Sequence, residues 1–311
     1  MKRIVVLMML FTLSLTACET GETVKVIVPN GAPALSQIAV EYEAFEEETP
    51  RYDVDTVYGP EPLISAFGSE SHEIIIAPVN LGAKLYTEAD APYRFAATLT
   101  WGNLYLASGE SLESLADLDG KTITAFGRNA TPDIVLKAVL NTYQFETSPT
   151  LEYVDGVDTA LSTLGENSDS VVLAAEPALS AYEMKAGNIQ TLDLQDEWIK
   201  RVSEEAYPQA GVFVHMSLSN AVIDTYLKSL EKSTELVNED HERLGTMIET
   251  LEYPFPPSLM DSVIPRSHIA YKGAIDSKES VTDYFEVIDT FNGALFGSQM
   301  PEDDFYYDRA S

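Results

Sequence analysis

Cysteine and histidine are scarce in this sequence. Cys18 is the only cysteine among 311 residues, so the chain cannot form an internal disulfide. The four histidines are scattered along the chain without the spacing of metal ligands. They are His72, His215, His241 and His268. We therefore expect no disulfide framework, no metal site and no cofactor.

Basic residues are also few, with 19 Lys and Arg against 50 Asp and Glu, which gives a formal net charge of −31. Such a surface repels phosphate backbones and anionic lipid headgroups, so nucleic acid is excluded as a partner and the surface itself does not bind membranes. The acidic residues are dispersed, as in a solvated shell. Since 45% of residues are hydrophobic and 10% aromatic, the composition is that of a packed globular protein.

Catalytic motifs are missing as well. The sequence has no Gly-x-Ser-x-Gly elbow, no Walker-type loop and no His-Glu-x-x-His helix. Carboxylates are so abundant that choosing two as an acid and base pair would be arbitrary. We therefore expect a protein that is not an enzyme.

An apolar run occupies the N-terminus. Lys2 and Arg3 precede residues 4–15, which are almost wholly apolar and are shorter than the roughly 20 residues of a membrane span. Residues 15–18, LTAC, resemble a bacterial lipobox. We predict a signal peptide over 1–17, lipidation (palmitate) at Cys18 and a linker over 18–22, which would tether the protein outside the bacterial cell membrane. The alternative is an ordinary signal peptide with Cys18 incidental.

Strand and helix patterns alternate through the first two thirds of the chain. Short apolar or β-branched runs predict strands at 24–28, 52–58, 73–77, 122–126, 151–154, 171–174, 189–194 and 212–216. Apolar residues at helical spacing predict helices around 35–45 and at 63–67, 131–143, 158–164, 177–185, 223–236, 241–251, 258–263 and 280–291. This order is typical of βαβ units in covered sheets.

The two α/β sets and the helical tail predict two lobes, the first of them discontinuous. We place the chain crossings near residues 101–108 and 208–214. The first lobe would then comprise residues 19–104 and 213–311, and the second would comprise 105–212.

Loops rich in small, polar or aromatic residues follow the predicted strands, where open α/β sheets bind their ligands. Some precede helices, whose free N–H groups bind anions. The candidate ligand-binding residues in them are Asn30, Ala32, Tyr58, Asn80, Trp101, Asn103, Arg128, Asn129 and Glu176. Since Gly, Pro and Asn form turns in any loop, plain turn formation is the alternative.

Three of these candidates have specific alternatives. Arg128 could clamp an anionic ligand or form a surface ion pair. Glu176 could accept a hydrogen bond from a ligand amine or stabilise the first turn of the next helix. Trp101 could line a cleft, stacking on a planar ligand as Tyr58 could, or belong to the core.

Five stretches carry a resemblance to a known family. They are VIVPNGAPA (26–34), IAPVNLGA (76–83), LADLDGKT (115–122), AAEP (174–177) and PEDDFYY (301–307). In their order and spacing they resemble the solute-binding lipoproteins of ABC importers, with the type 2 periplasmic-binding fold. The nearest group is the NMT1/THI5-like one, which includes nitrate, taurine, alkanesulfonate and thiamine-pyrimidine binders.

The resemblance implies two lobes, each a mixed, mostly parallel sheet flanked by helices, with two crossing strands as a hinge. A monomer would close around one small polar, planar or anionic molecule and dock on a permease driven by an ATPase. Fungal relatives are enzymes that make a pyrimidine with a cysteine-rich iron segment, which this chain lacks. The remaining alternatives are a small-molecule enzyme on the same fold and a ligand-sensing lipoprotein.

Overall fold

The computed structural model of the chain describes residues 23–46, 51–166, 170–187, 189–253 and 256–308. The predicted signal peptide, Cys18 and the linker over 18–22 lie outside the described residues. Among the helices of the described part, none is both long enough and apolar enough to cross a membrane.

A six-stranded sheet combines strands from both ends of the chain, in the order β11-β4-β10-β3-β1-β2. Strand β1 is parallel to β2 and β3, whereas β10 is antiparallel to β3 and β4, and β11 is antiparallel to β4. The strands are β1 (Val24–Pro29), β2 (Tyr52–Val57), β3 (Ile74–Pro78), β4 (Tyr93–Thr100), β10 (Ala210–His215) and β11 (Ile269–Gly273).

A five-stranded sheet is built from the middle of the chain, in the order β7-β6-β8-β5-β9. Strand β6 is parallel to β7 and β8, and β5 is antiparallel to β8 and β9. The strands are β5 (Leu104–Ser108), β6 (Thr122–Phe126), β7 (Thr150–Val154), β8 (Val171–Ala175) and β9 (Gln190–Asp193). The predicted fold class, two mixed sheets flanked by helices, is confirmed.

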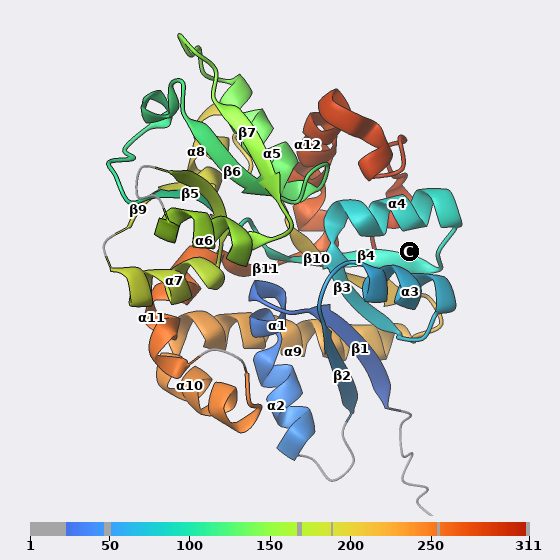
Figure 1. Cartoon of the computed structure of the whole chain (residues 1–311). Coiled ribbons are helices and arrows are strands. Elements are labelled where there is room, and N and C mark those ends of the chain that lie inside the picture. The colour runs from blue at the N-terminus through green and yellow to red at the C-terminus, as the bar shows by residue number, and fades with distance from the viewer. Residues whose placement is uncertain (1–22, 47–50, 167–169, 188, 254–255, 309–311) are drawn as a thin grey trace, which may run out of the picture.

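Helices cover both faces of each sheet (Figure 1). Helices α3, α4 and α12 lie on one face of the six-stranded sheet, and α1, α2 and α9 lie on the other. Helices α5 and α8 pack on one face of the five-stranded sheet, and α6 and α7 pack on the other. Side chains alternate between the two faces along β3, which explains its burial on both sides. Ile75 points toward α3, α4 and α12, whereas Ile74 and Ile76 point toward α1, α2 and α9.

The helices have the following bounds. They are α1 (Ala32–Ser36), α2 (Ile38–Glu46), α3 (Glu61–Ser69), α4 (Val79–Ala89), α5 (Thr131–Asn141), α6 (Val157–Glu166), α7 (Ala178–Ala186), α8 (Leu194–Arg201), α9 (Asn220–Glu239), α10 (His241–Thr250), α11 (Met260–Ser267) and α12 (Ala274–Asn292). Short 3-10 turns lie at Leu115–Leu118, Pro257–Leu259, Gly293–Leu295 and Asp303–Phe305.

The chain passes between the sheets twice, at residues 101–103 and again between α8 and β10. The two passages run close together, since Gln209 N donates to Thr100 O over 2.8 Å. We propose to divide the chain into lobes at these passages. The first lobe is then the six-stranded sheet with α1–α4 and α9–α12, and the second lobe is the five-stranded sheet with α5–α8.

Five elements were not predicted from the sequence: β4, β5, β11, α4 and α8. Residues 78–80 were interpreted as a loop, but α4 begins at Val79. Gly82 weakens the sequence signal for this helix, because glycine is a poor helix former. Its presence has a packing reason, since a Cβ at position 82 would lie 2.0 Å from the Phe213 ring. The missing side chain lets α4 lie close to β10.

Gly102 lies at the first passage with φ +94°, and a Cβ there would be 2.4 Å from the Tyr207 ring. Gly102→Ala should therefore suffer both backbone strain and a collision. Gly187→Ala is the matched control, because Gly187 has φ +88° with nothing within 4 Å of the Cβ position. In urea unfolding, Gly102→Ala should lose about 1–3 kcal/mol more than Gly187→Ala. Equal losses would show that the Tyr207 ring moves aside without a measurable cost in stability.

Candidate functional site

Polar side chains from both lobes meet near the start of α4. Asn80 donates from Nδ2 to Leu295 O over 3.1 Å, and its Oδ1 accepts from Thr131 Oγ1 over 3.2 Å. Thr131 opens α5 in the second lobe, and its Oγ1 also accepts from the Tyr284 hydroxyl of α12 over 3.2 Å. Asn80, a residue predicted for the site, therefore lies at the boundary between the lobes.

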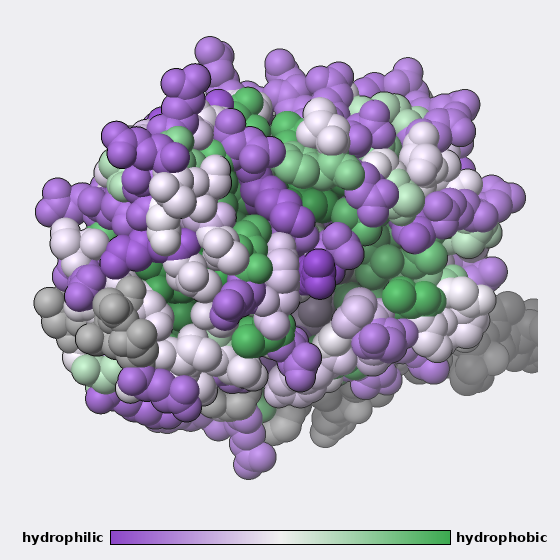
Figure 2. Space-filling view, turned by 45° about the horizontal axis from the view of Figure 1, so that its top comes forward, coloured by the Kyte–Doolittle hydropathy of each residue, from purple (hydrophilic) through white to green (hydrophobic). Residues whose placement is uncertain are grey.

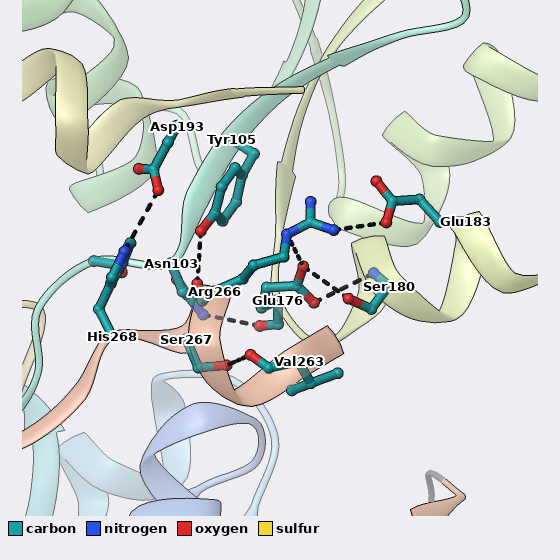
Figure 3. Close-up of polar contacts among 11 residues, drawn as sticks. Asn103, Tyr105, Glu176, Ser180, Glu183, Asp193, Val263, Arg266, Ser267 and His268 are labelled. Carbon is teal, nitrogen blue, oxygen red and sulfur yellow. Dashed lines mark hydrogen bonds and ion pairs between the residues drawn. The ribbon is translucent and has the colours of Figure 1, made fainter. Parts of the chain in front are cut away.

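A second polar cluster lies where α7 faces α11 (Figure 3). Glu176 follows β8, and its Oε1 lies 2.9 Å from Arg266 Nε of α11. The same carboxylate accepts from Ser180 Oγ over 3.0 Å and from Ser180 N over 3.3 Å. Arg266 also contacts Glu183, with 2.6 Å between Nη1 and Oε2, and its guanidinium carbon lies 4.7 Å from the centre of the Tyr105 ring.

Burial controls the electrostatics of this cluster. The Glu176 side chain is 0% exposed, whereas that of Arg266 is 21% exposed. Loss of hydration raises the pKa of Glu176 to about 7, even though Arg266 and the Ser180 hydrogen bonds lower it. Glu176 therefore titrates near neutral pH, far above an ordinary glutamate.

Asn103 and Trp101 lie in the first passage between the sheets. Asn103 Nδ2 donates to Glu176 O over 2.8 Å, and Glu176 N donates to Asn103 O over 3.0 Å. Asn103 is 6% exposed, and its Oδ1 has no hydrogen-bond partner within the described part of the chain. Trp101 Nε1 donates to Ala270 O over 2.8 Å, so this buried ring ties the passage to β11.

The turn between β1 and α1 lies opposite Pro177. Asn30 N donates to Val57 O over 2.9 Å, and Ala32 is buried as the first residue of α1. A Cβ on Gly31 would be 3.8 Å from Pro177 Cδ, which places this turn against the residue after Glu176. The two strand-end loops therefore approach each other across the lobe boundary.

Three other predicted residues lie apart from these contacts. Tyr58 is 71% exposed. Arg128 is exposed and its guanidinium carbon lies 4.9 Å from the centre of the Tyr153 ring. Asn129 is exposed, has φ 59° and donates from its backbone N to Asp133 Oδ2 over 2.8 Å, which orders the start of α5.

Sequence patterns did not identify four boundary residues: Thr131, Arg266, His268 and Tyr284. His268 Nδ1 contacts Gly102 O, and His268 Nε2 lies 3.4 Å from Asp193 Oδ2 of the second lobe. For Arg266 one signal was present, since it is one of only 19 basic residues in the chain. In so acidic a chain, each basic residue is a candidate partner for a buried carboxylate, and Arg266 is one of them.

On the face drawn in Figure 2, many hydrophilic side chains surround a shaded recess near the middle of the view. A surface cavity of about 630 Å³ lies on the first lobe beside α12. Two ion pairs of the chain occupy four of its charged lining residues, with Arg94 bound to Asp304 and Lys278 bound to Asp303. We therefore take the lobe boundary, not this cavity, as the candidate site.

Comparison with solved structures identifies the architecture. An ABC transporter protein from Parabacteroides distasonis has 18% identity and a TM-score of 0.78, covering 92% of this chain and 99% of that one. The aliphatic sulphonate binding protein SsuA from Escherichia coli has 12% identity and a TM-score of 0.70, covering 93% and 92%. SsuA from Xanthomonas axonopodis pv. citri, bound to MOPS, has 14% identity and a TM-score of 0.62, covering 91% and 97%.

No protein-family model matches the sequence, and no curated protein sequence is significantly similar to it. The solved structures show the fold alone at these levels of identity. As the sequence resemblance predicted, the chain has the periplasmic-binding-protein fold. Its structural neighbours include proteins named for an ABC transporter and for sulfonate binding.

Proposed function

We propose that this protein is a solute-binding receptor of an ABC importer, which captures one small polar organic molecule between its two lobes. The observation that carries the proposal is the meeting of polar side chains from both lobes: Asn80 with Thr131, and Glu176 with Arg266. Of these residues, Asn80 and Glu176 lie just after strands β3 and β8. Ligands of open α/β sheets bind at such strand ends. The structural neighbours named for an ABC transporter and for sulphonate binding support the same role.

Two features support a polar ligand. Asn103 Oδ1 is a buried acceptor without a partner in the described residues, and such a group costs free energy unless a ligand or water donates to it. The start of α5, beside Asn80 and Thr131, adds free backbone N–H groups that attract an oxygen-bearing ligand. Anionic molecules are therefore included in the proposed ligand class.

The membrane tether is part of the proposal. Cleavage before Cys18 and acylation of its thiol would hold the mature chain on the extracytoplasmic face of the membrane, beside a permease and its ATPase. The composition supports a covalent tether, because a formal charge of −31 gives the body no attraction for anionic headgroups. We expect the receptor to act as a monomer.

Native mass spectrometry of freshly purified residues 19–311 tests the proposal, because it detects a ligand carried through purification. Calorimetry against amino acids, sulfonates and pyrimidines then measures affinity. Stoichiometric binding of one small molecule supports the receptor. Absence of binding to every solute class would contradict it, and turnover of a bound molecule would favour an enzyme on this fold.

Asn80→Ala should weaken binding of that ligand about tenfold, since one hydrogen bond contributes about 1.4 kcal/mol. Asn141→Ala is the matched control, because Asn141 is exposed at the far end of α5. Its affinity should equal that of the wild type. Calorimetry on both variants, with melting temperatures recorded, separates binding from stability. Equal affinities in the two variants would remove Asn80 from the site.

A further inference from the structure

Arg266 is the cation of the second boundary cluster. It extends from α11 of the first lobe, and the carboxylates of Glu176 and Glu183 and the ring of Tyr105 that surround it all belong to the second lobe (Figure 3). Its own backbone is held as well, since the Tyr105 hydroxyl donates to Arg266 O over 2.9 Å. A single side chain thus makes its charged contacts across the boundary.

The surroundings make these contacts strong. Exposed ion pairs contribute little, but a pair with one fully buried partner is poorly screened by solvent. Glu176 is such a partner, with a side chain that is 0% exposed. Apolar packing lies alongside, because Ala181 of α7 packs against the cluster of α10 and α11 residues that includes Val263. Separating the lobes here would break both ion pairs and expose this packing together.

We infer that Arg266 is a positioning residue that holds the second lobe closed against the first before any ligand binds. This inference rests on the proposed function, in which the lobes open to admit a ligand. Arg266 then sets ligand affinity without touching the ligand. The affinity of a receptor falls with the fraction of molecules in the binding-competent state, so loss of the closed state weakens capture.

The charged surroundings predict how the contribution of Arg266 depends on pH. Three groups face Glu176: Arg266 from α11, Glu183 from α7 and Tyr105 from β5. Burial raises the pKa of Glu176 to about 7. Above that pH Glu176 is ionised, and Arg266 then stabilises the closed lobes most. Below it, the protonated carboxyl tolerates the loss of the cation. Removal of Arg266 should therefore open the lobes more at high pH than at low pH.

Distance measurements in the ligand-free protein test this inference. The chain from residue 19 onward has no cysteine, so Ser65→Cys on α3 and Thr159→Cys on α6 give one exposed spin-label site on each lobe. With Arg266 present, double electron–electron resonance should show one dominant short distance. Arg266→Gln should shift most of the population to a longer and broader distribution at pH 8.5, and less of it at pH 5.5.

Arg201→Gln is the matched control. Arg201 also binds a buried glutamate, with 2.6 Å between its Nε and Glu197 Oε2, but both residues lie on α8 within the second lobe. This variant should keep the short distance, and Arg266→Lys should recover it in part. An additional Glu176→Gln variant tests whether Glu176 carries the pH dependence, which this variant should then abolish. A distribution unchanged by Arg266→Gln at both pH values would overturn the inference.

The two proposals fail in different ways. The distance measurement contains no ligand, so an altered distribution supports the role of Arg266 even if calorimetry finds no solute. Where a ligand is found, Arg266→Gln should weaken its binding about tenfold or more at pH 8.5. Binding by the wild type with an unchanged distance in Arg266→Gln would keep the receptor and reject the role of Arg266.

Discussion

Glu176→Gln should become more stable relative to the wild type as the pH rises from about 5 to about 8, by about 3 kcal/mol in all. The physical reason is the burial of Glu176, which raises its pKa to about 7 in the folded protein. Between its unfolded and folded pKa values, the folded state binds more protons than the unfolded state. The wild type therefore loses stability as the pH rises through this window, and the neutral amide does not.

Urea unfolding of both proteins at several pH values measures this difference. Glu197→Gln provides the control, because Glu197 is also a buried glutamate. Burial raises its pKa, but Arg201 and Lys200 lower it to a net value below the ordinary one. Its difference from the wild type should stay constant over the same window. A constant difference for Glu176→Gln as well would mean that Glu176 is ionised in the folded protein throughout.

Tyr284→Ala should be among the most destabilising substitutions, with a loss of about 3–5 kcal/mol. Tyr284 is 1% exposed on α12, and its ring centre lies 6.0 Å from those of both Trp198 and Tyr207. Its hydroxyl donates to Thr131, so the residue joins α12 to the second lobe. Truncation would leave a cavity where the lobes meet.

Tyr284→Phe isolates the hydroxyl and should lose only about 1 kcal/mol in urea unfolding at neutral pH. Tyr58→Ala serves as the surface control, because Tyr58 is 71% exposed. Its stability should stay within about 0.5 kcal/mol of the wild type. If Tyr284→Ala loses as little as Tyr58→Ala, the aromatic contacts at the boundary do not stabilise the fold.

Local patterns in the sequence predict the strands that are buried on both faces. The run at residues 171–174 forms most of β8, which is buried because helices cover both faces of the sheet. Strand β11 (Ile269–Gly273) shows the opposite case. It is short, ends in lysine and glycine and is partly exposed, so nothing local separates it from a loop. Its pairing with β4, from far earlier in the chain, forms it.

In the candidate site, too, some residues were predicted from local patterns and others were not. Asn80, Asn103 and Glu176 were predicted because they follow strands, and the fold brings them to the lobe boundary. Of its two predicted roles, Glu176 fulfils the one at the helix start, since it accepts from the Ser180 amide in the first turn of α7. Its contact with a ligand amine stays a prediction. Its pairing with a cation gives it a contact across the boundary in addition to its role at the start of α7.

The residues that the sequence did not reveal come from the helical tail. Arg266 and Glu183 are 83 residues apart, and Tyr284 and Thr131 are 153 apart. Helices α11 and α12 read as ordinary amphipathic helices, and only the return of the chain to the first lobe places them against the second. Long-range pairing of this kind has no local signature.

The position of β10 sets an order of events during synthesis. In the six-stranded sheet, β10 lies between β3 and β4 and is hydrogen-bonded to both. All the strands of the five-stranded sheet precede β10 in the chain. As the polypeptide is synthesised from its N-terminus, no strand joins β3 to β4 by hydrogen bonds until residues 210–215 are made. The first lobe, whose strands β1 to β4 are made first, therefore receives its inner strand β10 only after all five strands of the second lobe have been made.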